Sequence, residues 1–351
     1  MMDTRCAQPV VLALDDPEWH RFVTEMPDCT PFHHPAWAQM LAATYHYPGL
    51  AVGIRDGRGR LVAGAPFLEV RGVSGRRRWI SLPFTDECPP LATDPGGVSE
   101  LGGALVALQE RRHGPAIEIR GRVDGIGWRS GADAVIHELE LSPDVDQVRG
   151  RFSKSQVVRN ISRAERAGVS VRRANANCDL EEFYALHTRT RRRQGVPVQP
   201  RRFFELMWTR LIEPGLGYIL LAYTGGNVAS AGAVFLRDRG TTIYKFGASD
   251  PGSWPWRPNH LIFWTAIQDA CAHGDRRFDF GRTDLGNDGL RAFKRAWGGR
   301  ERPLVYSALV PGAAAGAERA LTRALSVTIR NSPPWVCRGV GAALYRFAGS
   351  R

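Results

Sequence analysis

The chain of 351 residues is 43% hydrophobic and 23% charged, which is the balance of a folded soluble protein and excludes a disordered chain. Its length suffices for two domains, each with its own core. The six cysteines include no CxxC pair, and no histidine stands at zinc-finger spacing. This pattern excludes a disulfide scaffold and a zinc finger, and it predicts reduced thiols in a cytosolic protein. The net charge of +12 fits a nucleic-acid, phosphate or anionic-lipid partner, and it equally fits a surface rich in solvated arginine.

The sequence predicts neither a leader peptide nor a membrane span. The first residues, MMDTRCAQPVVLALDDPEWH, hold a short apolar run followed by acids, which is unlike a signal peptide. The longest mostly apolar window, 218–236, is interrupted by TGGN, so we expect no helix to cross a membrane. We therefore expect a cytoplasmic protein.

The first half of the chain is typical of mixed helix and strand. The segment 31–45 has a helical period, and 49–70 places two apolar runs around RDGRGR, which is a hairpin pattern. The remaining elements are a strand running into a proline-rich loop, a helix that ends at a glycine, and two strands (77–94, 98–114, 115–121 and 134–141). Together they predict a first domain over residues 1–145.

The second half starts with a basic helix over 142–168, which we expect to link the domains. A strand follows, then a helix opened by Asp179 with Glu182 at capping-box spacing, then a helix that starts at a proline and ends at a glycine. A three-stranded meander, a helix, a strand, a short helix and a last strand complete the order (217–225, 227–238, 241–249, 258–274, 276–281, 289–299 and 302–310).

This order is that of an N-acyltransferase domain of the GNAT type, and the first half repeats it more loosely. The predicted fold class is α+β (α/β), with two tandem GNAT-like domains whose mixed central sheets are flanked by helices. The second domain is predicted over 146–310, and a helical tail over 311–351.

Three stretches resemble the Fem-like (FemAB/FemX) aminoacyltransferases and the related BioF2-like acetyltransferase domain. They are FSKSQVVRNISRAERAGVSV, FYALHTRTRRRQGVPVQPRRFFELMW and FDFGRTDLGNDGLRAFKRAWGG, all within 150–309. Residues 30–145 match more loosely, through WISLPFTDECPPL. The resemblance implies two GNAT-like domains that face a shared cleft. It also implies transfer of an aminoacyl group from tRNA, or of an acyl group from another activated donor, to an amine.

Two features depart from that family. The chain has no room for the long helical hairpin arm of members that extend a peptidoglycan bridge. The loop GASDPGSWPWRPNHL lacks the (Q/R)xxGx(G/A) spacing of acetyl-CoA enzymes and holds three prolines. Since that spacing serves phosphate through backbone N–H groups, which proline lacks, the loop favours aminoacyl-tRNA over acyl-CoA as donor.

Lysine is rare in this chain. Of the 47 lysine and arginine residues, only Lys154, Lys245 and Lys294 are lysines. Acyl transfer passes through an oxyanion, and one fixed donor to that charge contributes roughly 3 kcal/mol. Lysine offers a compact charge for this role, whereas arginine offers a planar fork. The resemblance puts Lys294 on the catalytic lysine of the family's Phe-Lys pair, with Phe293 as its partner; the alternative is a solvated helix lysine.

Basic and aromatic residues elsewhere are candidates for substrate binding. Lys154 and Arg159 could hold phosphate or the tRNA backbone, or form an exposed helix face. Lys245 is expected in a strand with Tyr244 and Phe246 on the opposite face, so that it faces either the substrate or solvent. A run of four arginines ends the helix before Gly195 and suits the helix dipole, and it could equally touch tRNA or a diphosphate (Arg189, Arg191, Arg192 and Arg193).

The segment FDFGRTD ends a strand and opens a loop, where functional residues gather. Arg282 could bind a phosphate or carboxylate bidentately. Asp284 could orient the amine, as could Asp279, for which an ion pair with an arginine is the alternative. His260 could act as a base or be a cap or a packed side chain. Two aromatic residues complete the predicted substrate contacts (Trp256 and Tyr244).

The sequence shows no nucleophilic triad and no metal-ligand set, so we expect direct transfer in a ternary complex without a cofactor. The co-substrate is aminoacyl-tRNA or, as the alternative, acyl-CoA, and the acceptor is an amine of a peptide or cell-envelope precursor. A non-catalytic GNAT-like protein that binds an anionic glycan or lipid is the third interpretation. The apolar and basic tail, 322–351, is expected to pack on the body or to contact a membrane surface. We expect a monomer.

Overall fold

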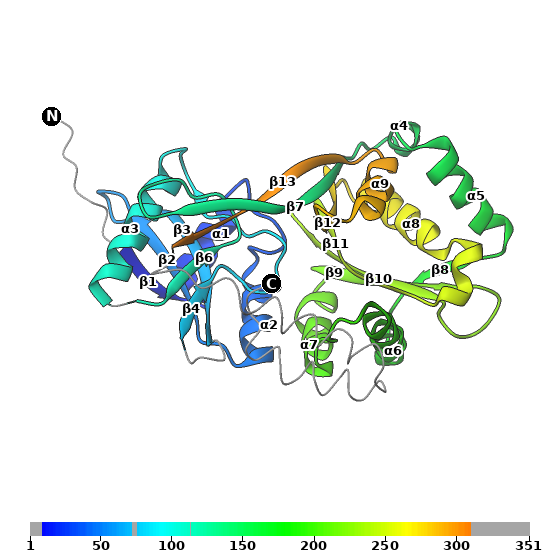
Figure 1. Cartoon of the computed structure of the whole chain (residues 1–351), viewed down its shortest axis with the longest axis horizontal. Coiled ribbons are helices and arrows are strands. Elements are labelled where there is room, and N and C mark those ends of the chain that lie inside the picture. The colour runs from blue at the N-terminus through cyan, green and yellow to red at the C-terminus, as the bar shows by residue number, and fades with distance from the viewer. Residues whose placement is uncertain (1–8, 72–75, 113, 310–351) are drawn as a thin grey trace. The chain divides into compact units, whose positions relative to one another are not determined.

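The computed structural model describes residues 9–71, 76–112 and 114–309 (Figure 1). The chain divides into two compact units. One contains the residues up to Asp133 and resumes at Leu304; the other is Ala134–Pro303. The predicted boundary at residue 145 therefore lies inside the second unit, and the predicted tail lies outside the described residues.

The first unit is built on a mixed sheet with the order β1-β2-β3-β4-β6-β13, and β5 pairs with β3. The predicted hairpin is confirmed as β2 and β3, with Gly49 opposite Leu68. Only β4 and β6 pair in parallel among the pairs described in this unit. The bounds of its elements are β1 (Pro9–Ala13), α1 (Pro17–Glu25), α2 (Pro35–Tyr45), β2 (Gly49–Arg55), β3 (Leu61–Arg71), β4 (Arg77–Ile80), β5 (Leu91–Ala92), α3 (Gly97–Arg112), β6 (Ala116–Ile119) and β13 (Arg300–Leu309). The first residues of β13, up to Pro303, belong to the second unit.

The second unit has a sheet with the order β7-β12-β11-β10-β9-β8, in which β11 and β12 are parallel. In Figure 1, α5 and α8 cover one face of this sheet and α6 and α7 the other. The predicted fold class, mixed sheets flanked by helices, is confirmed. Its elements are β7 (Arg129–Glu140), α4 (Val145–Gly150), η1 (Lys154–Val158), α5 (Arg159–Arg166), β8 (Ser170–Arg173), α6 (Asn177–Gln194), α7 (Arg201–Met207), η2 (Trp208–Ile212), β9 (Gly217–Tyr223), β10 (Ala231–Asp238), β11 (Thr241–Ser249), η3 (Pro251–Trp256), α8 (Pro258–Ala272), β12 (Arg277–Asp284) and α9 (Asp288–Ala296).

The predicted long helix over 142–168 is wrong, because the chain breaks it at Ser153. After α4 the chain turns, and the Ser153 hydroxyl accepts the backbone N–H of Gln156 at 3.3 Å, which starts a new helix. The Ser153 N–H donates to the Ala296 carbonyl at 2.8 Å. The first turn after the break is a π-helix, η1, which continues as α5.

The predicted capping box at Asp179 is also shifted. The helix α6 starts at Asn177, and Asp179 is its third residue. The Asp179 carboxylate reaches back and accepts the N–H groups of Asn175 at 2.9 Å and Ala176 at 3.3 Å. Glu182 instead accepts from the Tyr223 hydroxyl at 2.9 Å and ties α6 to the sheet.

A bulge in β11 sets the faces of the sheet on which the Tyr244 and Phe246 side chains lie. Val234 pairs with Phe246 and Phe235 pairs with Tyr244, so Lys245 is the extra residue. Tyr244 therefore packs on Phe235 on the α8 side of the sheet. Phe246 packs on the opposite side, against aromatic residues of α6 and α7 (His187, Phe203 and Phe204). The prediction that Tyr244 and Phe246 share a face is wrong, because one inserted residue reverses the alternation.

Candidate active site

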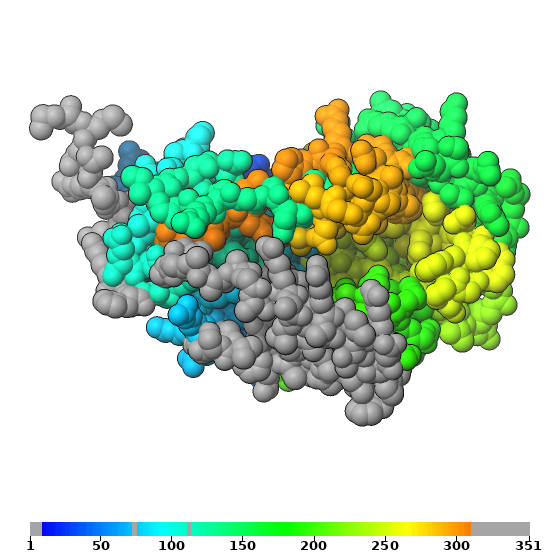
Figure 2. Space-filling view, in the orientation of Figure 1, coloured from blue at the N-terminus to red at the C-terminus, as the bar shows by residue number. Residues whose placement is uncertain are grey.

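A cavity of about 420 Å³ lies in the second unit. The strands β11 and β12 pair only over Thr241–Ile243 and Arg277–Asp279, and the cavity is next to the part of β11 that follows. Figure 2 shows the surface of this unit hollowed beside α9, which is orange. The cavity is lined by β10, β11, the end of α6, the start of α8, and α9, through residues that include Thr190, Arg193, Gly232, Tyr244, Gly247, Trp254, Arg257, His260, Phe263, Leu290, Phe293 and Lys294.

Lys294 is buried in the wall of this cavity, with 2% of its surface exposed. Its Nζ donates to the carbonyl oxygens of Gly281 at 2.7 Å and Arg282 at 3.1 Å. A solvated helix lysine, which was the alternative, does not fit this burial. A buried ammonium needs polar partners, and β12 supplies them as carbonyl dipoles.

Phe293 lies beside Lys294 in the same wall. Its ring meets those of His260 and Phe263 edge-on, at centroid distances of 5.5 and 5.8 Å. The predicted pair thus faces one cavity, and its catalytic role remains a prediction.

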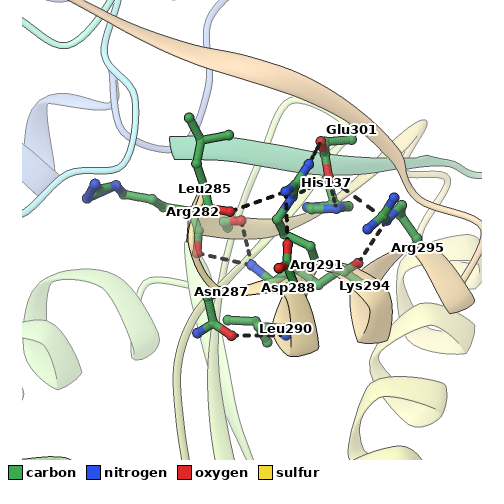
Figure 3. A network of polar contacts seen from close by, with 11 residues as sticks. His137, Arg282, Leu285, Asn287, Asp288, Leu290, Arg291, Lys294, Arg295 and Glu301 are labelled. Carbon is green, nitrogen blue, oxygen red and sulfur yellow. Dashed lines mark hydrogen bonds and ion pairs between the residues drawn. The ribbon is translucent and has the colours of Figure 1, made fainter. Parts of the chain in front are cut away.

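Arg291 anchors α9 on β13. Its guanidinium donates to both carboxylate oxygens of Glu301, at 2.8 Å from Nη2 and 3.1 Å from Nε. The same side chain donates to Asp288 and to the Leu285 carbonyl, each at 3.2 Å, as Figure 3 shows. Bidentate arginine–carboxylate pairs fix orientation as well as distance, so this contact holds the helix that carries Lys294.

His137 of β7 completes the network around Glu301 (Figure 3). Its Nε2 lies 3.1 Å from a Glu301 carboxylate oxygen. Burial, with a smaller contribution from the charge of Lys294, lowers the pKa of His137 to about 4. The ring is therefore neutral at pH 7 and does not compete with Arg291 for the negative charge of Glu301.

His260 is buried at the start of α8. Burial, with a smaller contribution from the charge of Arg257, lowers the pKa of His260 to about 4, while a hydrogen bond from the ring to the Gln156 carbonyl opposes this shift. A general base works best when its pKa is near the working pH. This environment disfavours His260 as the base and favours a neutral polar group that contacts substrate.

Tyr244 presents a neutral phenol to the cavity. Burial raises the pKa of Tyr244 to about 12, so its hydroxyl keeps its proton throughout the physiological range. The predicted substrate contact thus lies in the cavity wall, and the bulge at Lys245 explains why it faces this side.

Cations and an exposed tryptophan surround the side of the cavity formed by η3 and the end of α6. The Arg193 guanidinium lies over the Trp254 ring at 5.4 Å and donates to the Ser249 carbonyl at 3.2 Å. Trp254 donates through Nε1 to the Ser249 hydroxyl at 3.0 Å. Arg257 stands next to them in the left-handed region, with a φ of 58°. The predicted arginine run therefore places one member, Arg193, at the site.

Several predicted residues do not line the cavity. Lys154 and Arg159 are exposed on η1 and α5. Trp256 is exposed, and its neighbour Trp254 takes the lining position. Lys245 lies over the Phe246 ring at 5.6 Å, because the bulge directs it away from Tyr244.

The two residues at the end of β12 pair with each other. Arg282 Nη2 donates to the Asp284 carboxylate at 2.7 Å, and Asp284 is exposed. Neither lines the cavity, although the Arg282 carbonyl holds Lys294. Asp284 lies outside the site because it faces solvent where β12 ends.

Residues 151–295 match the family model of an acetyltransferase (GNAT) domain. Over 85 residues the chain is 34% identical to the Lipid II:glycine glycyltransferase of Staphylococcus haemolyticus (strain JCSC1435). The matched segment is 22% of this chain and 20% of that protein, so the similarity covers about a fifth of the relative's length.

Solved structures resemble almost the whole chain. FemX has a TM-score of 0.69 at 16% identity, over 90% of this chain and 100% of its own. L-PGS from Bacillus licheniformis has a TM-score of 0.55 at 14% identity, over 91% of this chain and 97% of its own. A tandem GNAT protein from the clavulanic acid biosynthesis pathway has 0.52 at 12% identity, over 87% and 99%. The predicted resemblance to Fem-like GNAT proteins is confirmed, and these structures show a tandem GNAT fold.

Proposed function

We propose that this Fem-like chain is an acyltransferase that forms an amide in the cavity of its second unit. One observation carries the proposal: Lys294, one of three lysines in the chain, is buried in the cavity wall and held by two carbonyls. Burying the Lys294 ammonium costs free energy of desolvation. Stabilisation of an oxyanion in the cavity would explain why a charged residue lies there.

The reaction joins an amine nitrogen to the carbonyl carbon of the donor ester or thioester. Attack converts the carbonyl oxygen to an oxyanion, and the amine gives up a proton. Collapse re-forms the carbonyl and expels the ribose hydroxyl or thiol, which takes up a proton. Lys294 would stabilise the oxyanion, an effect typically of 10²–10³-fold in kcat for one donor. The neutral Tyr244 hydroxyl can donate a hydrogen bond in the same cavity.

The donor is proposed to be aminoacyl-tRNA. Trp254 with Arg193 and Arg257 offers a stacking surface and positive charge for a nucleotide end, and stacking of a base contributes roughly 1–3 kcal/mol. Prolines open η3, stand inside it at Pro255 and open α8, so this turn has few N–H groups for a CoA diphosphate. Acyl-CoA remains the alternative donor.

The acceptor is proposed to be an amine of a peptide or cell-envelope precursor. The similarity to a Lipid II:glycine glycyltransferase supports this class of acceptor. The third interpretation, a non-catalytic binding protein, does not explain why Lys294 is buried in the cavity wall. Among the described residues, no helix is both long and apolar enough to cross a membrane.

The test is an acyl-transfer assay with purified protein, offering charged tRNA or acyl-CoA with an amine-bearing envelope peptide. Mass spectrometry of the peptide reports the amide. Lys294→Ala should lower kcat by about 10²–10³-fold. Lys154→Ala removes an exposed lysine outside the cavity and should leave kcat unchanged. Product from acyl-CoA alone would overturn the proposed donor, and full activity of Lys294→Ala would overturn the proposed catalytic role.

A further inference from the structure

The strand β12 is irregular directly beside Lys294. Asp279 pairs with Glu138 and Arg282 pairs with Ile136 on β7, so Phe280 and Gly281 together oppose the single residue His137. Gly281 has a φ of 72°, a region that costs an L-residue roughly 1–2 kcal/mol. Glycine is therefore the residue that this bulge tolerates best.

Asp279 stabilises the bulge from inside. Its side chain is buried, with 6% of the residue exposed, and its Oδ1 accepts the Gly281 N–H at 2.7 Å. A backbone N–H that leaves the strand ladder needs another acceptor when it is buried. The Asp279 carboxylate is that acceptor, so the left-handed turn at Gly281 depends on it.

At the bulge two successive carbonyls contact one side chain. In a regular antiparallel pair the carbonyl groups lie in the ladder and point at the neighbouring strand. Here the carbonyls of Gly281 and Arg282 both accept from Lys294 Nζ, at 2.7 and 3.1 Å. The Gly281 peptide therefore has Asp279 on its N–H side and Lys294 on its carbonyl side.

We propose that Asp279 is a positioning residue for Lys294. Asp279 fixes the orientation of the Gly281 peptide. The carbonyl of that peptide then holds the Lys294 ammonium at one point of the cavity wall. The expected effect of Asp279 on the rate rests on the proposed function. Its expected effect on the position of Lys294 rests on the geometry alone. A misplacement of about 1 Å can cost on the order of 10²-fold in rate.

The kinetic test compares Asp279→Ala, Asp279→Asn and the double variant with Lys294→Ala. Asp279→Ala should lower kcat about 10- to 100-fold, with KM changed less than about twofold, because the substrate contacts are unchanged. Asp279→Asn should restore most of kcat, because its amide oxygen still accepts the Gly281 N–H. In the Lys294→Ala background, Asp279→Ala should have no further effect on kcat, since coupled residues are not additive. An equal further decrease there would overturn the proposal.

The matched control is Asp275→Ala. Asp275 is also a buried aspartate of this unit, and it accepts from Arg237 at 3.0 Å and Thr242 at 2.6 Å. This variant should lose stability while the folded fraction keeps its kcat. If both variants lower kcat alike, Asp279 has only a structural role and the proposal fails.

A second readout needs no activity. The chain has three lysines, so mass spectrometry resolves amine-reactive labelling of each one. Lys294 should label slowly and exposed Lys154 rapidly, and Asp279→Ala should raise the labelling rate of Lys294 about tenfold while Asp275→Ala does not. Unchanged labelling of Lys294 in folded Asp279→Ala would overturn the positioning role. Inactivity with every donor, accompanied by the expected labelling, would overturn the proposed function alone.

Discussion

The Tyr244 hydroxyl lies where a side chain on residue 247 would begin. An ideal Cβ on Gly247 would stand 1.8 Å from the tyrosine Oη and 2.9 Å from its Cζ. Glycine at this position therefore lets the phenol lie along β11 in the cavity wall. We expect Gly247→Ala to displace the ring, because overpacking of this kind costs typically 1–3 kcal/mol, and to lower kcat with it.

A double variant separates this contact from a general effect of alanine in the strand. Tyr244→Leu removes the atoms that the new methyl group meets, so Gly247→Ala should cost much less stability in that background. Urea denaturation of the four proteins measures the coupling. Equal losses in both backgrounds would show that Gly247 serves something other than Tyr244.

Two neighbouring tryptophans provide a matched comparison at the donor side of the cavity. Trp254 and Trp256 are 47% and 45% exposed, and only Trp254 is in the cavity wall. Trp254→Ala should raise the KM for the donor about 5- to 150-fold, the range of one stacked base, with kcat nearly unchanged. Trp256→Ala should change neither constant, and steady-state kinetics against donor concentration checks both. An equal effect of the two changes would contradict the assignment.

The order of the elements was predictable, because each follows from local periodicity and turn residues. The second unit shows this in the meander and in the helix, strand and short helix that follow it. The rarity of lysine in this chain also drew attention to Lys294, which lies in the cavity wall. These signals are local, and neighbouring residues suffice to produce them.

What the sequence did not predict depends on single inserted residues and on distant partners. The alternation at Tyr244 was misread because Lys245 is a bulge, and a strand pattern alone does not mark the inserted residue. Glu301 and His137 join the network that holds α9 from strands whose pairing is set by the whole sheet. Charge and hydropathy along the chain carry no signal for such contacts. A glycine two residues after Asp279 in a strand, in FDFG, was a usable indication of the bulge.

Glu301 should link the stability of the fold to the position of α9. Hydrogen bonds from Arg291 hold the pKa of Glu301 below its usual range. Its contribution to stability is therefore full above the ordinary glutamate pKa and is lost as the pH falls through the lower folded value. We expect Glu301→Gln to lower Tm at pH 7, with a difference from the parent protein that shrinks below about pH 4.5.

The control for this change is Glu140→Gln. Glu140 is exposed on β7 and lies 3.7 Å from Arg300, and exposed pairs contribute little. Its Tm should match the parent at every pH. The result that would contradict this prediction is a Tm difference between Glu301→Gln and the parent that stays constant from pH 7 to pH 4. It would show that the charge of the Glu301 carboxylate does not contribute to the contact with Arg291.

Buried histidines should make the fold sensitive to mild acid. Burial lowers the pKa of His137 and His260 to about 4 and that of His187 to about 3. Each is neutral in the folded chain, while the unfolded chain takes up a proton below about pH 6.5. The stability from these neutral rings is therefore full above pH 6.5 and falls with pH toward the folded values. Between pH 6 and 5 each should remove up to about 1.4 kcal/mol per pH unit from the free energy of unfolding.

His187 is the histidine to test, because it lies among Phe183, Phe204 and Phe246 and outside the cavity lining. His187→Leu should lower stability at pH 7, because it removes the contact of the ring with Gln199 at 3.1 Å. It should also reduce the slope of the free energy of unfolding against pH between pH 6 and 5. The reduction expected for one titrating group is up to about 1.4 kcal/mol per pH unit. His273→Gln, at an exposed position, should leave that slope unchanged. Urea denaturation at half-unit pH steps measures the slopes, and a His187→Leu slope equal to that of the parent would show that His187 is already protonated in the folded chain.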